Sequence, residues 1–313
     1  MSPVLIKPRP LRSGDRIAIV APASPCARDE FDAGVAELRR LGFEPVYEPS
    51  VFDREGYVAG SAEARAAAIG AALGDDSVRA IVCVRGGYGS VQVLPWLDPA
   101  DVRRARKPFV GYSDLTSLLT FVTGRCGVVA FHGPTVAGRL ERGPSAYDEA
   151  TLAGALMNAR PLGPLQAPGL ETFRPGEASG LLAGGNLTQL AASMGTPYAF
   201  DPPAGAVLFL EDVNERPYRL DRLWTQLRLA GVIERASAIV FGEFPGCDEP
   251  GGDPLGRDTL ARLVRAFPGP VLFGFPSGHT AGAAMTLPFG VRARVVTGSQ
   301  PTLVIEEAAV SDR

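Results

Sequence analysis

The sequence has little cysteine and almost no histidine, and both shortages restrict its chemistry. Its 313 residues include four cysteines and two histidines. The cysteines form no C-x-x-C pair, so neither a zinc ribbon nor a dithiol redox site has support. The histidines stand far apart, at positions 132 and 279, and no H-E-x-x-H motif occurs. We therefore expect reduced thiols, no bound metal and no cofactor.

Long apolar runs and a strong excess of one charge are also missing. No segment approaches the roughly 18 consecutive apolar residues of a membrane span, and the run Val4–Ile6 is far too short for a signal peptide. The formal net charge of −3 provides no basic surface for nucleic acid or membranes. We expect a cytoplasmic protein that acts on a small molecule or peptide. A homodimer is one option for its assembly, which the sequence does not decide.

The composition is typical of a globular protein large enough for two domains. Apolar residues make up 46% and charged residues 21% of the 313 residues, which exceed what one core usually supports. Through residues 16–131, short apolar runs alternate with amphipathic stretches, a pattern that predicts right-handed crossovers and a parallel sheet. The expected strands are 16–21, 80–84, 109–111 and 128–131, and the expected helices are 29–41, 62–73 and 117–122.

The second half of the chain follows a segment rich in proline and glycine, residues 159–177, which has linker composition. The strands expected beyond it are 180–184, 206–210, 238–241, 271–275, 291–296 and 302–305, and the helices are 218–229 and 258–266. The prediction is an α/β protein with a doubly wound parallel-sheet domain in residues 1–158. A linker, 159–177, joins it to a mixed α/β, strand-rich domain in residues 178–313.

Ser113 is the candidate nucleophile. It lies where a short apolar strand breaks into a tight turn and a helix begins, which is how α/β enzymes expose a nucleophilic hydroxyl. Gly111 allows the sharp turn, and Asp114 stands where its side chain could cap the following helix. The N–H group after the serine is then free to face a substrate carbonyl.

A glycine loop, Arg85-Gly-Gly-Tyr-Gly-Ser90, directly follows another apolar strand. It therefore lies at the carboxyl edge of the sheet, where open α/β folds bind ligands. Its spacing matches neither a dinucleotide fingerprint nor a P-loop. We predict that the amides of Gly87 and Asp114 form an oxyanion hole. The alternative is a tight turn without a ligand.

A serine nucleophile needs a base, and the base needs an acid to orient it. Only His132 and His279 can be the base, and the Gly, Ser and Thr neighbours of His279 suit an exposed imidazole better. Glu211 and Asp212 end an apolar strand, where only one of two neighbouring side chains can point inward. The alternatives are a surface carboxylate pair or a helix cap. Glu243 is a reserve candidate.

Substrate contacts are harder to identify. Arg85 and Arg216 could each hold a carboxylate through two parallel hydrogen bonds, although most surface arginines are merely solvated. Tyr88 lies within the glycine loop, and Asn186 lies in a turn that leads into a helix. We include these four residues as substrate-binding candidates. For Asn186 a helix cap is slightly favoured over a substrate contact.

Six motifs occur together in one order. They are Arg85-Gly-Gly-Tyr-Gly, Gly111-Tyr-Ser-Asp-Leu-Thr, His132-Gly-Pro, Gly184-Gly-Asn-Leu, Leu210-Glu-Asp-Val-Asn-Glu-Arg-Pro-Tyr and Gly274-Phe-Pro-Ser-Gly-His-Thr. In this combination the chain resembles the LD-carboxypeptidase family of serine peptidases from about residue 13 to residue 300. The resemblance implies that Ser113, Glu211 and His279 are nucleophile, acid and base. It also implies a serine-bearing amino-terminal domain, a carboxyl-terminal domain with the other two residues, and a cleft between them.

The activity that this resemblance implies is removal of the terminal D-alanine from murein tetrapeptides during cytoplasmic cell-wall recycling. The cut is at the bond between an L-configured centre and D-alanine, through an acyl-enzyme on Ser113. A sister group cleaves microcin-type peptide nucleotides and has a longer, aromatic-bearing loop before the catalytic glutamate. Residues 186–211 contain no tryptophan, which favours the murein substrate. A non-catalytic two-domain binding protein is the alternative from another class.

Overall fold

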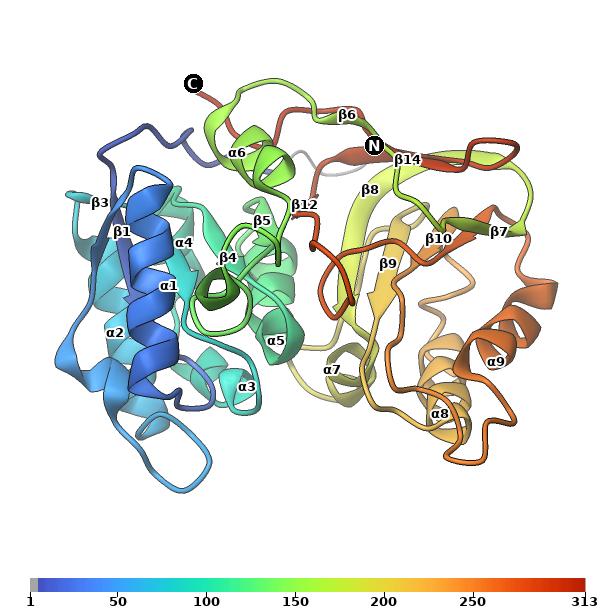
Figure 1. Cartoon of the computed structure of the whole chain (residues 1–313), viewed down its shortest axis with the longest axis horizontal. Coiled ribbons are helices and arrows are strands. Elements are labelled where there is room, and N and C mark those ends of the chain that lie inside the picture. The colour runs from blue at the N-terminus through green and yellow to red at the C-terminus, as the bar shows by residue number, and fades with distance from the viewer. Residues whose placement is uncertain (1–4, 313) are drawn as a thin grey trace.

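The computed structural model describes residues 5–312, which form two β-sheets with helices packed against them (Figure 1). The six-stranded sheet comes mainly from the amino-terminal half of the chain and the eight-stranded sheet from the carboxyl-terminal half. In Figure 1 the first sheet lies on the left, with β1 to β5 in blue to green, and the second lies on the right, mostly in yellow to red. The predicted α/β class is confirmed.

The first sheet is the predicted doubly wound parallel sheet, with strand order β12-β5-β4-β3-β1-β2. Its parallel strands are β1 (Arg16–Val20), β2 (Glu44–Val46), β3 (Val78–Cys83), β4 (Phe109–Gly111) and β5 (Ala130–His132). The helices of this half are α1 (Arg28–Arg40), α2 (Ala62–Gly74), α3 (Ser90–Val93), α4 (Pro99–Ala105), α5 (Thr116–Thr120) and α6 (Glu149–Met157). Strand β3 is almost entirely buried, as expected for a parallel strand with helices on both faces.

Two strands of this sheet were not predicted. Strand β2 is only three residues long and contains Pro45, and it lies at an edge, where a missing N–H group is tolerated. The other is β12 (Leu287–Phe289), which pairs antiparallel with β5. It crosses over from the carboxyl-terminal half of the chain, so the two halves share one sheet. Its short Leu-Pro-Phe sequence carries no periodicity that predicts a strand.

The second sheet is mixed and strand-rich, as predicted, with the order β6-β14-β13-β8-β9-β10-β11-β7. Its strands are β6 (Gly163–Leu165), β7 (Glu171–Arg174), β8 (Glu177–Asn186), β9 (Val207–Glu211), β10 (Ala238–Phe241), β11 (Val271–Phe273), β13 (Arg292–Val296) and β14 (Thr302–Ile305). Strands β8, β9, β10 and β11 run parallel to one another. The helices are α7 (Leu187–Ala192), α8 (Pro217–Leu229) and α9 (Gly256–Leu263).

The segment 159–177 is more than the expected linker. It contributes β6 and β7, which form the two edges of the second sheet. Edge strands pair on one side only and therefore tolerate proline and glycine, such as Gly163 and Pro164 of β6. Composition alone did not distinguish this arrangement from a linker.

Strand β9 separates the two apolar cores of the molecule. Its side chains alternate: Val207 and Phe209 belong to the large core that extends from the first sheet, whereas Leu208 and Leu210 belong to the core beneath α8 and α9. The strand ends at Glu211, which by the same alternation lies on the face of Phe209. The strand's alternation therefore directs this carboxylate toward the first sheet.

Helix α5 packs directly against the second sheet. The N–H group of Asn186, at the end of β8, donates a hydrogen bond of 2.9 Å to Thr116 Oγ1. Gly185 has φ of +133°, and a Cβ atom there would lie 2.6 Å from the same oxygen. Only glycine allows this close approach. The helix that begins beside Ser113 is thus held against the sheet that ends in Glu211, as the central position of α5 in Figure 1 shows.

We predict that Gly184→Ala destabilises the protein by about 3 kcal/mol or more. Gly184 has φ of +143°, and a Cβ atom there would lie 1.8 Å from the carbonyl oxygen of Phe209, so β8 and β9 must separate. Gly195→Ala is the matched control, because Gly195 also has a positive φ, +82°, but open space around it. It should lose only about 1 kcal/mol. Urea unfolding measures both, and equal losses would contradict the packing argument.

Candidate active site

Ser113 has a strained backbone and a free hydroxyl group. It follows β4 and has φ of +68°, a left-handed conformation that residues other than glycine rarely adopt. A short 3-10 turn, Ser113–Leu115, then leads into α5. Strain at a strand-to-helix turn is typical of an exposed nucleophile. The side chain is partly exposed, and its Oγ forms no hydrogen bond to any of residues 5–312.

The glycine loop lies against this serine. A Cβ atom on Gly86 would lie 2.9 Å from Ser113 Oγ and 3.2 Å from the backbone nitrogen of Asp114. Gly87 has φ of +98°, and a Cβ atom there would lie 2.4 Å from Ser24 Oγ. A side chain on Gly86 would therefore fill the space beside the Ser113 hydroxyl, and one on Gly87 would collide with Ser24. The N–H groups of Gly87 and Asp114 have no hydrogen-bond acceptor within the described chain.

The side chain of Asp114 does not cap its own helix, contrary to the sequence prediction. It is buried, and its Oδ2 accepts a hydrogen bond of 2.8 Å from the N–H group of Ser90, while Ser90 Oγ donates one of 2.6 Å to the Asp114 carbonyl. Burial raises the pKa of this carboxyl group. Asp114 thus holds the start of α3, and with it the glycine loop, beside Ser113.

Glu211 and His279 form a buried acid–base pair. Glu211 Oε2 lies 2.7 Å from His279 Nδ1 and accepts a second hydrogen bond, of 3.0 Å, from the His279 N–H group. The Glu211 side chain is 0% exposed and that of His279 is 21% exposed. With Nδ1 bound to the carboxylate, Nε2 is the nitrogen that remains for a substrate or a nucleophile.

The two members of this pair shift each other's pKa. Burial lowers the pKa of His279, but the charge and hydrogen bond of Glu211 raise it by more, so it lies above its ordinary value. Burial likewise raises the pKa of Glu211, but the charge of His279 and its hydrogen bonds outweigh this and lower it. The carboxylate therefore stays ionised and keeps the imidazole oriented.

Asp212 points to the other side of the strand end. Its Oδ1 accepts a hydrogen bond of 3.0 Å from Asn186 Nδ2, and its Oδ2 accepts one of 2.9 Å from the N–H group of Thr188. Burial raises its pKa to about 6. Asn186 is itself buried and caps α7 through the N–H group of Gln189. Both side chains therefore hold the start of α7, and the cap interpretation of Asn186 is the better one.

His132 is enclosed beneath this pair. It is 0% exposed, and its Nδ1 lies 3.0 Å from Ser277 Oγ. Because Ser277 Oγ donates to the carbonyl of Met285, His132 Nδ1 carries the proton and Nε2, which has no partner among residues 5–312, is unprotonated. Burial lowers its pKa to about 4. Gly278, with φ of +73°, separates the ring from Glu211, since a Cβ atom there would contact both.

Residues 17–133 match the model of the LD-carboxypeptidase N-terminal domain, and residues 179–295 match that of the LD-carboxypeptidase C-terminal domain. The murein tetrapeptide carboxypeptidase of Pseudomonas aeruginosa is 34% identical over 85% of this chain and 88% of its own length. The chain belongs to the LD-carboxypeptidase family.

Solved structures agree with this LD-carboxypeptidase assignment. The muramoyltetrapeptide carboxypeptidase of Oxalobacter formigenes superposes with a TM-score of 0.82 at 29% identity, over 94% of this chain and 99% of that one. The microcin C7 self-immunity protein MccF, in complex with aspartyl sulfamoyl adenosine, superposes with a TM-score of 0.91 at 25% identity, over 97% and 99%. The chain is therefore a peptidase-family hydrolase with the two-domain fold of both groups.

Both arginine candidates are already paired with carboxylates. Arg85 lies 3.7 Å from Glu30, and Arg216 forms an ion pair with Glu249 on the surface. A substrate carboxylate would have to compete with these partners, so their substrate role stays a prediction. Glu243, the reserve acid, accepts a hydrogen bond of 2.9 Å from the N–H group of Ala281 and does not bind the His279 ring.

Tyr88 is exposed and forms an edge-to-face contact with a second exposed tyrosine, Tyr57, at 5.6 Å between ring centres. The sequence analysis missed Tyr57, which lies in a loop without periodicity. Because Tyr88 is part of the glycine loop, this aromatic pair stands close to Ser113. Its exposed ring faces could contact the substrate, and Tyr88 stays a predicted contact.

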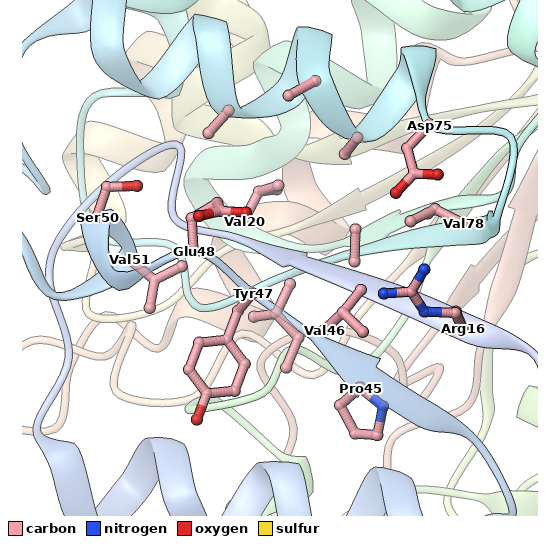
Figure 2. A pocket seen from close by; sticks show the side chains of 15 residues that line it. Arg16, Val20, Pro45, Val46, Tyr47, Glu48, Ser50, Val51, Asp75 and Val78 are labelled. Carbon is pink, nitrogen blue, oxygen red and sulfur yellow. The ribbon is translucent and has the colours of Figure 1, made fainter.

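Two large pockets lie away from these residues. One, of about 440 Å³, lies between β1, β2 and α2, and Figure 2 shows Arg16, Glu48 and Asp75 around it. The other, of about 520 Å³, lies between the end of α5 and strand β8. Neither is lined by Ser113 or His279. Within the described chain, no group of three or more His, Cys, Asp or Glu side chains is arranged to hold a metal ion.

We predict opposite pKa shifts for the two histidines, measured by NMR titration of their imidazole signals. His279 should titrate above its ordinary pKa of 6.5 and His132 near 4. The base is then neutral only at pH values above the raised pKa, so activity should rise with pH through that titration. A His279→Asn variant assigns the signals. In Glu211→Gln the pKa of His279 should fall, because the negative charge is gone. A pKa of His279 below that of His132 would contradict the assignment.

Proposed function

We propose that the protein is a serine-type LD-carboxypeptidase that releases the terminal D-alanine from murein tetrapeptides. The observation that carries this proposal is the left-handed backbone of Ser113, at φ of +68°, beside the bare backbone of Gly86 and Gly87. A partner histidine supports it, because the His279 ring packs edge-on against Tyr112 at 5.2 Å between ring centres. Tyr112 directly precedes Ser113. The proposed base thus packs against the residue that precedes the proposed nucleophile.

The proposed reaction runs through an ester of Ser113. As Ser113 Oγ bonds to the carbonyl carbon before D-alanine, His279 Nε2 takes the hydroxyl proton, and Glu211 stabilises the resulting imidazolium. The amides of Gly87 and Asp114 are the proposed donors to the oxyanion, each contributing on the order of 3 kcal/mol. The C–N bond then breaks, and the proton on Nε2 passes to the nitrogen of D-alanine. Water activated by the same nitrogen hydrolyses the ester and returns the proton to Ser113.

A peptide-nucleotide substrate is the second candidate, because MccF is a relative. The connection between α7 and β9 argues against it. Its aromatic residues are Tyr198, which packs on Phe121 and Arg125 at the far end of α5, and Phe200, which is buried. Neither offers a free ring to a nucleobase beside Ser113. A murein peptide therefore remains the better substrate.

The cellular role that goes with this substrate is cell-wall recycling in the cytoplasm, and it is part of the proposal. Within residues 5–312, none of the helices has the length and apolarity to cross a bilayer. A purely binding function, the alternative from another class, provides no reason to hold a serine in a strained turn, since such strain costs about 1–3 kcal/mol. Catalysis does provide one.

We predict that the protein releases D-alanine from a tripeptide–D-alanine, detected by mass spectrometry, and that Ser113→Ala and His279→Ala each lower kcat about 10⁴-fold or more. The reason is that a nucleophile and its base act as a unit. His132→Asn is the control histidine variant. It should lose much less activity, because the fully buried ring of His132 cannot exchange a proton with a substrate. A peptide–nucleotide conjugate tested in parallel should be the poorer substrate.

Three results would contradict these predictions. Ser113→Ala with wild-type activity, together with activity lost on EDTA dialysis and restored by zinc, would replace the serine mechanism with a metal-dependent one. Equal activity of His279→Ala and the wild-type protein would exclude His279 as the base. Faster cleavage of the peptide–nucleotide conjugate would move the chain to the second candidate function.

A further inference from the structure

Arg139 is a buried cation whose hydrogen bonds all go to backbone carbonyl groups. The residue is 6% exposed. Its Nη1 donates to the carbonyls of Ala146 at 3.3 Å and Gly282 at 3.1 Å, and its Nη2 donates to those of Gly278 at 2.8 Å and Thr280 at 2.6 Å. It forms no ion pair with any carboxylate of residues 5–312. Burying a guanidinium without a carboxylate costs free energy, which these four carbonyls offset only in part.

The acceptors of Arg139 surround His279. Three of them belong to the loop 278–282, which follows β11 and carries the histidine. A single nitrogen, Nη2, bonds the carbonyls of Gly278 and Thr280, one on each side of His279 in the chain. The peptide group before the histidine and the second peptide group after it are therefore held by the same side chain.

The loop is also bound to its own sheet. Glu211 at the end of β9 accepts from the His279 N–H group, and Glu243, which follows β10, accepts from the Ala281 N–H group. These bonds fix the imidazole relative to the second sheet only. Arg139 comes from the other side, because it lies in the segment that follows β5 of the first sheet. Together with the buried bond between His132 and Ser277, it connects the loop to the sheet that carries the nucleophile.

The other end of this connection reaches Ser113. The hydroxyl of Tyr112, the residue before Ser113, donates a hydrogen bond of 3.2 Å to the carbonyl of Gly138, the residue before Arg139. The Tyr112 ring also contacts the His279 ring. A short chain of contacts thus runs from Ser113 through Tyr112 and Arg139 to the backbone on both sides of His279.

We propose that Arg139 is a positioning residue that sets the distance between Ser113 and His279 across the junction of the two sheets. It acts through the loop backbone and touches neither the substrate nor the reacting atoms. The inference rests on the proposed function, since it presumes that Ser113 and His279 react together. The guanidinium group of arginine suits this task, because it is planar and rigid and can donate hydrogen bonds to carbonyl groups in several directions.

The charge of Arg139 provides a second readout. The charged and titratable groups around the His279 ring are Glu211, Asp212, Arg139, His132 and Tyr112. Arg139 acts to lower the pKa of His279, against the larger effect of Glu211. Removing its charge while the pair with Glu211 stays intact should therefore leave that pKa at its wild-type value or move it upward. A loop that collapsed would lose the hydrogen bonds that His279 donates to Glu211, and the pKa of His279 would fall toward 6.5.

The experiment compares Arg139→Met and Arg139→Lys with the wild-type protein, using D-alanine release from a tripeptide–D-alanine. A misplacement of about 1 Å costs on the order of 100-fold in rate. We expect kcat to fall about 100-fold in Arg139→Met with KM nearly unchanged, and about tenfold in Arg139→Lys, which keeps the charge but not the fork. The pKa of His279 by NMR should stay raised in both. Arg142→Met, an exposed arginine in the adjacent turn, is the control and should keep wild-type kcat.

Circular dichroism and thermal unfolding establish that each variant is folded. If Arg139→Met does not fold, the kcat of Arg139→Lys and the pKa of His279 in that variant alone test the proposal. Wild-type kcat in either folded variant would overturn the proposal. So would a fall in kcat accompanied by a fall in the pKa of His279, because that combination indicates a general loss of loop structure. Failure of the proposed function is separate, since it appears as an active Ser113→Ala protein whatever Arg139 does.

Discussion

The hydrogen-bonded pair of Glu211 and His279 is the constraint on which the surrounding structure depends. A carboxylate that is 0% exposed is stable only if a partner compensates its lost hydration, and here one oxygen accepts both the ring and the backbone N–H of the same histidine. The alternation along β9 directs Glu211 inward. Gly278 has no side chain because a Cβ atom there would contact Glu211 and His132 alike. The histidine thus reaches the acid only through a loop of one specific shape.

The pair of Glu211 and His279 and the proposed nucleophile Ser113 come from different sheets, so the junction between the sheets sets how they lie relative to one another. Helix α5 is joined to the end of β8 by the bond between Thr116 and Asn186, and the absent side chain of Gly185 permits the approach. The apolar core that fills the first domain continues across this junction to Val207 and Phe209. A continuous core resists sliding of the two sheets, which favours a rigid site over one that assembles on binding.

Periodicity was enough to predict most strands and helices, and the position of a serine at a strand-to-helix turn was enough to single out Ser113. Strands β2, β6, β7 and β12 were missed because none has a continuous apolar run, and three of them contain proline. Such strands exist only through pairing with neighbours that are distant in sequence. The same holds for the partner of Asp114, which is the N–H group of Ser90 rather than its own helix. Local sequence does not encode these long-range partners.

The sequence does not indicate which of the arginines are buried. Of the chain's many arginines, Arg65 and Arg139 are the buried ones among residues 5–312, and neither stands in a pattern that sets it apart. Arg65 donates to the carbonyls of Gly60, Pro22 and Gly89, and so holds the glycine loop much as Arg139 holds the loop of His279. Loops lack the regular backbone hydrogen bonds of helices and sheets, so their carbonyl groups need other donors. The guanidinium group of one buried arginine can donate to several of these carbonyls. The left-handed turn at Ser113 persists because the loops on either side of it are held in this way, which supplies the surrounding order that local strain requires.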